Sequence, residues 1–305
     1  MKKLLSLLLI GVIVLFSGCR VHAAPENRVT PPFFKITDPE TGGVVYLLGT
    51  MHIGIRNTVY PDEIYAALDE CSALAVEIDL QALEADQRRL SDAMRLLECQ
   101  GETAADYLGG EYPDIKKFFR KNRIYNSNLE KYIPSVWSSL LSNKLSSDCG
   151  YFSEYGTDRA MLAYAKEHSI EIIELETVEE QYQINANEPR RLQIYSLASS
   201  VHTDQKILKE QMKELYRAWS ENDGAAIERM LYEDEIPEEL SEEFAEYYYM
   251  MYESRQEKMA EFIQNTLDNG EKAVVAVGAM HCFATPDIFD FLDENVIIKS
   301  VSYSD

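Results

Sequence analysis

The chain has 305 residues, enough for one large domain or two small ones and for a sizeable core. Hydrophobic residues make up 46% and charged residues 27%, which is ordinary for a globular protein. The formal net charge of −23 creates a surface that repels phosphate backbones, so we expect no nucleic-acid partner.

The first residues have the pattern of a secretory signal. Lys2 and Lys3 precede an apolar run, residues 4–16, that is shorter than the roughly 20 residues of a membrane-spanning helix. We therefore predict a signal peptide over residues 1–19 and expect an exported protein. No later stretch is long and apolar enough to span a bilayer.

Two processing sites are compatible with this signal. Phe16-Ser-Gly-Cys19 resembles a lipobox, so Cys19 is a candidate for lipid attachment and hence for a membrane anchor. Alternatively, signal peptidase cuts near Ala24, or the segment stays uncleaved as an anchor. Each alternative places the rest of the chain outside the cytoplasm, with residues 20–32 as a tether.

The folded part is predicted to begin with a hairpin and a β-α-β unit. Residues 34–37 and 44–48 are apolar and β-prone, and turn residues separate them. A helix is predicted from Pro61 to Cys71, and a buried strand follows over residues 73–78. This order suggests a crossover onto a parallel sheet.

The rest of the chain alternates long helical stretches with short strands. Residues 80–150 are predicted to be mostly helical, and a further helix begins at Gly156-Thr-Asp158 and ends near His168. The later predictions are a strand at 170–175, helices over 179–268, a strand at 272–277, a helix capped by Thr285 and a closing strand at 296–303.

This order favours a single mixed-sheet α/β domain over residues 33–305. Strands lie at both ends of the chain, and the helical insertion at about 179–268 is expected to form a cap. Apart from Cys19, the cysteines are Cys71, Cys99, Cys149 and Cys282, which an exported protein could pair. Their pairing cannot be read from the sequence.

Two short turns carry the chemical signal. Gly49-Thr-Met-His52 and Gly278-Ala-Met-His281 each follow an apolar strand, and ligands of open α/β sheets bind beyond the carboxyl ends of strands. Four carboxylates also lie at predicted strand ends: Glu77, Asp79, Glu174 and Glu176. Imidazole and carboxylate together suit Zn²⁺, Mn²⁺ or a similar ion. The plainer alternative is a pair of turn histidines that serve packing, with solvated carboxylates at the strand ends.

The ordered set of motifs resembles the TraB/GumN family, which includes the Tiki metalloproteases and the pheromone-shutdown protein PrgY. The resemblance covers about residues 44–292. Its motifs are Tyr46-Leu-Leu-Gly-Thr-Met-His52, Ala75-Val-Glu77, Tyr155-Gly-Thr-Asp158, Glu174-Leu-Glu176-Thr, Arg255 and Val277-Gly-Ala-Met-His281.

The resemblance implies a metal-dependent hydrolase, in particular a peptidase acting on peptides or polypeptide N-termini, with a fold similar to the erythromycin-esterase and ChaN proteins. It implies that His52, His281 and Glu77 hold a divalent ion (Mn, Co or Zn) and that Arg255 stabilises an oxyanion or clamps a substrate carboxylate. Gly49, Asp158, Glu176 and Gly278 are the expected supporting residues. The chain departs from the family pattern around His281, where Met280-His281-Cys282-Phe283-Ala284 replaces the frequent Gly-His-Leu-x-Gly, and at Gln256, where the family often has Asn.

Two other functions fit the same residues. A non-catalytic binding protein would use the crevice to sequester a peptide signal or a metal complex without turnover. A cysteine hydrolase would use Cys282 as the nucleophile beside His281, but neighbouring residues on an extended segment point in opposite directions. Substrate fate separates the binding protein from the enzyme, and Cys282→Ser separates the two enzymes.

Overall fold

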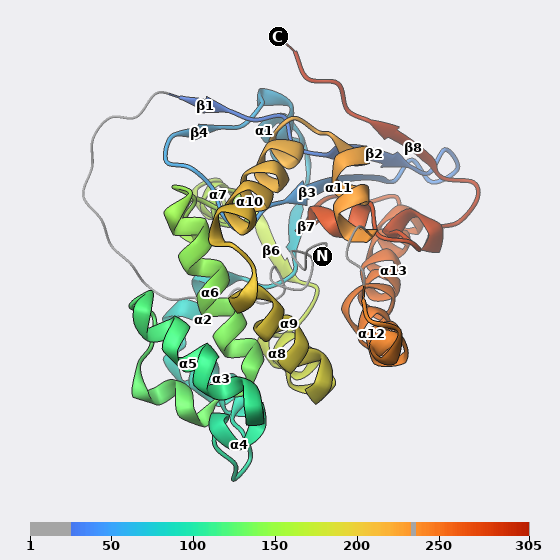
Figure 1. Cartoon of the computed structure of the whole chain (residues 1–305). Helices are drawn as coiled ribbons and strands as arrows, with labels where there is room; N and C mark the ends of the chain where they lie inside the picture. The colour runs from blue at the N-terminus through green and yellow to red at the C-terminus, as the bar shows by residue number, and fades with distance from the viewer. Residues whose placement is uncertain (1–25, 233–235, 305) are drawn as a thin grey trace.

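The computed structural model describes residues 26–232 and 236–304, and its centre is a mixed sheet (Figure 1). The sheet has six strands in the order β6-β5-β7-β3-β2-β8. Their bounds are β2 Phe33–Thr37, β3 Val44–Thr50, β5 Ala73–Val76, β6 Glu171–Glu174, β7 Lys272–Gly278 and β8 Ile297–Ser300. A separate parallel pair joins β1 (Asn27–Arg28) to β4 (Thr58–Val59). The predicted α/β class is confirmed.

The first long strand and the last long strand lie side by side. β3 pairs with β7 in parallel, from Val44 opposite Lys272 to Thr50 opposite Gly278. The predicted hairpin is also present, since β2 pairs antiparallel with β3. β7 lies between β3 and β5, so the crossover from β3 skips one position in the sheet. Both histidine turns therefore leave the sheet at the same edge.

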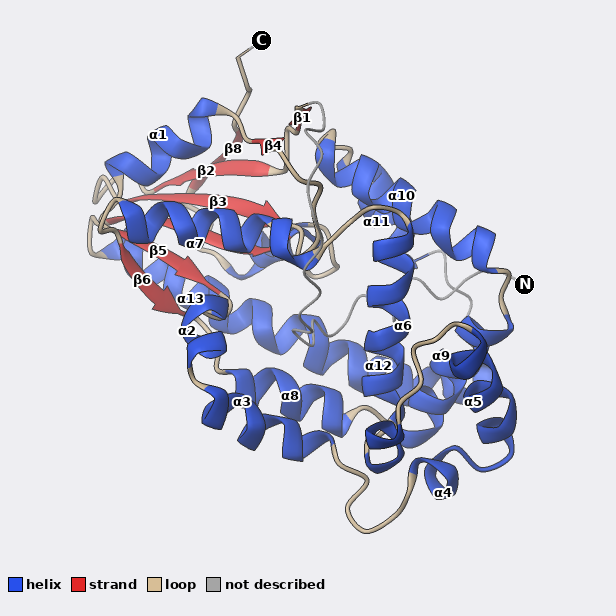
Figure 2. Cartoon of the chain, turned by 90° about the vertical axis from the view of Figure 1, so that its left-hand side faces the viewer, coloured by secondary structure: helices blue, strands red, loops and turns tan. Residues whose placement is uncertain are grey.

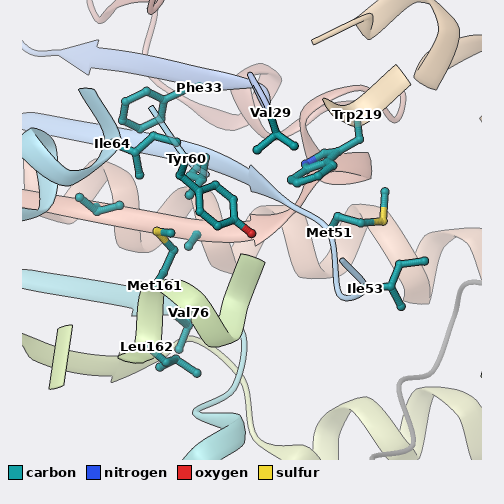
Figure 3. Close-up of a cluster of buried hydrophobic side chains, with 14 of the residues drawn as sticks. Val29, Phe33, Met51, Ile53, Tyr60, Ile64, Val76, Met161, Leu162 and Trp219 are labelled. Atoms are coloured by element: carbon teal, nitrogen blue, oxygen red, sulfur yellow. The ribbon is translucent and has the colours of Figure 1, made fainter. Parts of the chain in front are cut away.

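Strand alternation divides the central sheet into two apolar faces. On β7, Val274 and Ala276 join the core that α1 (Asp62–Glu70) and α7 (Thr157–Glu167) cover. Figure 3 shows part of this core, including Ile64 of α1 and Met161 of α7. Val275 and Val277 join a second core under α13 (Ser254–Asp268). Helices on both faces explain why β7 is a continuous apolar run.

The helical part is built from two stretches of the chain. Its members are α2 Leu80–Ala85, α3 Gln87–Met94, α4 Ala104–Leu108, α5 Tyr112–Lys121, α6 Pro134–Asp148, α8 Val178–Asn187, α9 Arg190–His202, α10 Gln205–Ser220, α11 Gly224–Tyr232 and α12 Ser241–Tyr248. Phe119, Leu141, Val178 and Leu197 share one core, so helices from both stretches pack together. Figure 2 shows this part beyond the arrowheads of β3 and β5, at the carboxyl edge of the sheet.

The C-terminal segment differs from its prediction. Asp287, and not Thr285, caps the next helical turn: its side chain accepts hydrogen bonds from the backbone N–H groups of Phe289 and Asp290. The turn is a short 3₁₀ helix, Ile288–Phe291, and the bond between Thr285 and Pro286 is cis. The carboxylate of Asp287 competes successfully for the cap, because it satisfies two backbone donors at once.

Other predictions concern the cysteines and the N-terminus. Cys71, Cys99, Cys149 and Cys282 are free thiols. The predicted signal over residues 1–19 and residues 20–25 of the predicted tether lie outside the described residues. Residues 26–32 pack on the fold instead of forming a tether, since β1 pairs with β4 and Val29 is buried in the core. Within the described ranges, no helix has the length and apolar character required to cross a membrane.

Candidate active site

The two histidine turns touch each other at the carboxyl edge of the sheet. His52 follows β3, and His281 lies in a 3₁₀ helix, Ala279–Cys282, that follows β7. A Cβ added to Gly49 would lie 3.2 Å from the Cα of Ala279, so a larger residue would push the turns apart. Gly49 is therefore needed for the close approach of the two turns.

Gly278 is the point on which three polar side chains converge. A Cβ added there would lie 3.2 Å from Glu77 Oε1 and 3.9 Å from both His52 Nε2 and His281 Cδ2. The three side chains come from the ends of β3, β5 and β7, neighbours in the parallel part of the sheet. The structure thus brings together the residues that the sequence placed at three separate strand ends.

Asp158 fixes the ring of His52. His52 Nδ1 lies 2.9 Å from Asp158 Oδ2, and the hydroxyl of Thr50 donates to Asp158 Oδ1 over 2.7 Å. A Cβ on Gly156 would lie only 2.5 Å from the carbonyl oxygen of His52, so the start of α7 packs directly on the turn. Burial alone would lower the pKa of His52. The negative charge and hydrogen bond of Asp158 outweigh burial and raise this pKa to about 9.

A buried ion-pair network holds Glu77. Arg255 donates to Glu77 Oε2 over 2.7 Å and makes two further 2.7 Å bonds to Glu176. Gln181 of α8 donates to both carboxylates over 3.0 Å, and the backbone N–H of Gly278 donates to Glu77 Oε1 over 2.6 Å. Burial alone would raise the pKa of Glu77, but the positive charges of Arg255 and His52 outweigh it and lower this pKa.

The guanidinium group of Arg255 is largely occupied by protein acceptors. Besides the glutamates, it donates to the carbonyl oxygen of Met251 over 3.2 Å. Four hydrogen bonds therefore engage it in this structure. These contacts support a role in positioning Glu77, whereas the sequence suggested stabilisation of an oxyanion or a grip on substrate.

His281 lies in an apolar environment that contrasts with that of His52. It is 3% exposed, and its Nδ1 has no hydrogen-bond partner among the described residues. The ring of Tyr252 meets it edge to face at 5.8 Å between centroids. Burial, together with the charge of Arg255, lowers the pKa of His281 to about 3. Gln256, where the chain departs from the family pattern, donates to the carbonyl oxygen of His281 over 3.2 Å.

A π-helical segment supplies part of the wall beside the histidines. Residues Tyr249–Glu253 join α12 to α13 as a π-helix, which is wound more widely than an α-helix and occurs often at functional sites. Met251 and Tyr252 of this segment are buried, and both also line the cavity described next.

A cavity of about 170 Å³ extends from the histidines into the helical part. Among the described residues, its acidic, basic and imidazole side chains all lie at the sheet end: His52, Glu77, Asp158, Arg255 and His281. The opposite wall comes from α6, α8, α10 and α11 and carries no charge. Met51 and Trp219, which belong to the core drawn in Figure 3, also line the cavity.

Some sequence candidates lie outside this cavity. Asp79 caps α2, and Glu174 accepts a hydrogen bond from the Asp79 backbone and pairs with Arg89. Cys282 is 2% exposed, and burial raises the pKa of its thiol above the ordinary value, so it is not an activated nucleophile. Gln181 was missed by the sequence analysis, since only the fold brings α8 to Glu77.

The donor atoms around Gly278 are of the types that bind a divalent ion. Two imidazoles and one carboxylate are the ligand set of many catalytic zinc sites. The His281 atom nearest to the Gly278 position is Cδ2, which is bonded to Nε2, so the unpartnered Nδ1 is not the atom that faces this point. Among the described residues, no three His, Cys, Asp or Glu side chains are already gathered closely enough to form a finished metal site. The donor types fit such an ion, and side-chain movements, including one that turns a ring nitrogen of His281 toward Gly278, would be needed to bring the donors together.

A sequence model of the TraB/PrgY/gumN family matches residues 32–295, nearly the whole chain. The chain therefore belongs to the TraB/PrgY/gumN family. No curated protein matches the chain, and no solved structure does.

Proposed function

We propose that this member of the TraB/PrgY/gumN family is a metal-dependent hydrolase that cleaves peptides or polypeptide N-termini at the site around Gly278. One observation carries the proposal: His52 Nε2, His281 and Glu77 Oε1 converge on one glycine at the charged end of a cavity. A divalent ion (Mn, Co or Zn) would be held by these three side chains. Such an ion supplies Lewis acidity, which activates water and polarises a carbonyl group.

The remaining site residues prepare this arrangement. Asp158 holds His52 through Nδ1 and leaves Nε2 facing Gly278, as carboxylates commonly do behind a metal-binding histidine. Arg255 and Gln181 hold Glu77 through Oε2, the oxygen that does not contact Gly278, and the charge of Arg255 keeps the carboxyl group ionised. An ionised Glu77 is suited either to bind the ion or to accept a proton from water.

We also propose the finer features that the sequence suggested. The sheet and its covering helices are of the erythromycin-esterase and ChaN type. The part of the predicted insertion at 179–268 that precedes α13 acts as a cap over the site, whereas α13 covers a face of the sheet. The protein works outside the cytoplasm, held to the membrane through lipid on Cys19 or released by cleavage near Ala24. Replacing Cys19 by Ser would then release the protein from membranes, whereas continued membrane association would contradict the lipid anchor.

Metal content and peptide cleavage, measured on the same samples, test the proposal. We expect His52→Ala and His281→Ala each to lower bound metal and to reduce peptide hydrolysis at least about 10³-fold. His202→Ala is the matched control, since His202 is exposed, pairs with Glu111 and does not line the cavity. Unchanged metal content in both site variants would contradict a shared metal site.

The fate of the peptide decides between the enzyme and the binding protein. Glu77 already accepts hydrogen bonds on both oxygens, which favours the binding protein as the second candidate. Mass spectrometry of a peptide library after incubation with metal-loaded protein would find fragments for the enzyme. Recovery of intact, bound peptides from a folded and metal-loaded sample would establish the binding protein instead.

A further inference from the structure

Asn185 of α8 has a buried amide side chain whose oxygen has no hydrogen-bond partner among the described residues. It is 8% exposed and lines the cavity. An amide oxygen that loses water on folding and gains no donor is unfavourable. Of the buried side-chain atoms that lack a partner among the described residues, only Asn185 Oδ1 and His281 Nδ1 belong to residues that line the cavity, where a ligand would complete them.

We propose that Asn185 recognises a peptide unit of the substrate and that the adjoining wall receives one bulky, uncharged side chain. The inference rests on the proposed function, because it specifies the substrate of that same site. It assigns to Asn185 the role of a specificity-determining residue, for which an asparagine is well suited. Its amide offers a donor and an acceptor side by side, which matches the N–H and C=O groups of a peptide.

The position of Asn185 along α8 gives the spacing. Gln181, which donates to Glu77, lies four residues before Asn185 and therefore on the same helix face. Four residues of α-helix advance about 6 Å, whereas an extended peptide advances roughly 3.3–3.6 Å per residue. Asn185 is thus placed to contact a peptide unit about two residues away from the bond held beside Glu77.

The wall around Asn185 selects against charge. Its apolar residues are Val178, Tyr182, Ile184, Leu215, Trp219 and Ile227. Ser142, Asn143 and Ser146 are the polar residues that α6 adds, and none of them is charged. A charged substrate side chain would lose its hydration here without gaining an opposite charge, which is strongly unfavourable. An apolar side chain would instead gain from burial.

The size of the cavity limits the occupant. Its volume of about 170 Å³ includes the space beside the histidines. Apolar cavities of roughly 150 Å³ in other proteins bind one benzene molecule. The cavity therefore suits one side chain of the size of Leu or Phe together with its peptide unit, not several such groups.

Calorimetric titration with acetyl-Leu-Leu-Leu-amide tests the inference without requiring turnover. The full-length protein is treated with EDTA, so that binding is measured in the absence of hydrolysis. We expect the wild type to bind this peptide and not to bind the corresponding triglutamate amide. We expect Asn185→Leu to bind it at least about 10-fold more weakly, because the peptide unit then loses its partner. The thermal unfolding temperature of this variant should be unchanged or higher, since an unpaired amide is removed.

Two further variants make the result specific. Asn187→Leu lies on the same helix, exposed and hydrogen-bonded to Gln183, and should bind like the wild type. Asn185→Ala replaces Asn185→Leu if the leucine does not fit, and should weaken binding to a similar extent. When each substrate amide is replaced in turn by an ester, wild-type binding should weaken at one position. The same ester should change the affinity of Asn185→Leu only slightly.

The outcomes separate this inference from the proposed function. Binding that depends on Asn185, without any cleavage by metal-loaded protein, would support the inference and contradict the hydrolase. Cleavage that is indifferent to Asn185 would support the hydrolase and overturn the inference. Absence of wild-type binding to the trileucine amide, or equal binding by both Asn185 variants, would also overturn it.

Discussion

The two Gly-x-Met-His turns have the same pattern and opposite environments. The side chain of His52 is 35% exposed and pairs with Asp158, whereas His281 is 3% exposed and its Nδ1 is unpaired. The pKa of His52 is raised to about 9, and that of His281 is lowered to about 3. Near neutral pH, one ring is therefore positively charged and the other is neutral in the protein without a bound ion.

This difference comes from residues that lie far away in the sequence. Asp158 is 106 positions from His52, and Arg255, which disfavours charge on His281, belongs to a helix that precedes β7. A histidine motif therefore determines where an imidazole lies, while its tertiary neighbours determine whether it carries a proton. The following predictions test whether tertiary neighbours determine the charges at the site, from the largest expected effect to the smallest.

Replacing Arg255 by Met should have the largest effect. It would leave Glu77 and Glu176, which are 8% and 4% exposed, without their cation. We expect the free energy of unfolding to fall by about 3–5 kcal/mol, because breaking a buried ion pair leaves an uncompensated charge. Urea unfolding at pH 7 measures the change.

A second cation on the same helix provides the control. Lys258 of α13 pairs with Glu180 at the surface, with both side chains about half exposed. Lys258→Met should change stability by less than about 1 kcal/mol. Equal losses for the two variants would show that the Arg255 network is no stronger than a surface pair.

Replacing His281 by Leu should reduce acid sensitivity. In the folded wild type, His281 stays neutral down to about pH 3, whereas in the unfolded chain it takes up a proton near pH 6.5. The contribution of His281 to the free energy of unfolding therefore falls as the pH decreases from 6.5 to 3, by up to about 4 kcal/mol. The difference in stability between variant and wild type should move in favour of the variant over this range. A difference that does not vary with pH would contradict a neutral, buried His281.

Replacing Asp158 by Asn should act in the opposite direction and at higher pH. The pKa of His52 is raised in the folded state. The stabilisation by the Asp158–His52 pair is therefore complete below about pH 6.5 and is lost as the pH rises through 9. Because His52 is 35% exposed, solvent screening limits the expected loss at pH 6 to about 1–2 kcal/mol, vanishing above pH 9.

Histidine titration by NMR provides the direct measurement for this variant. The pKa of His52 should move from about 9 toward its ordinary value in Asp158→Asn. Glu111→Gln is the control, since it removes the exposed partner of His202 and should leave His52 unchanged. An unchanged His52 titration in Asp158→Asn would remove Asp158 as the cause of the shift.

Local patterns determined much of the fold in advance. The alternating apolar residues of β7 face two different cores, as the strand period requires, and the hairpin turn at residues 38–43 joins β2 to β3. The helix beginning at Gly156-Thr-Asp158 is also where the sequence placed it. These features depend on neighbours within a few residues, so the sequence specifies them directly. The prediction that Thr285 caps the turn before Ile288 was wrong. Thr285 and Asp287 are both suitable capping residues, and the sequence does not show which of them takes the position.

The sequence by itself determined that two histidines and Glu77 leave strand ends, and the family motifs identified the same residues. Only the tertiary structure decided that Gln181 holds Glu77, that Arg255 is occupied by two glutamates and that Asn185 is left unpaired. The physical reason is that hydrogen bonding, burial and charge are set by contacts between segments that lie up to about 200 residues apart, as between Glu77 and Gly278. The two turns share a sequence pattern, and the fold makes them chemically different.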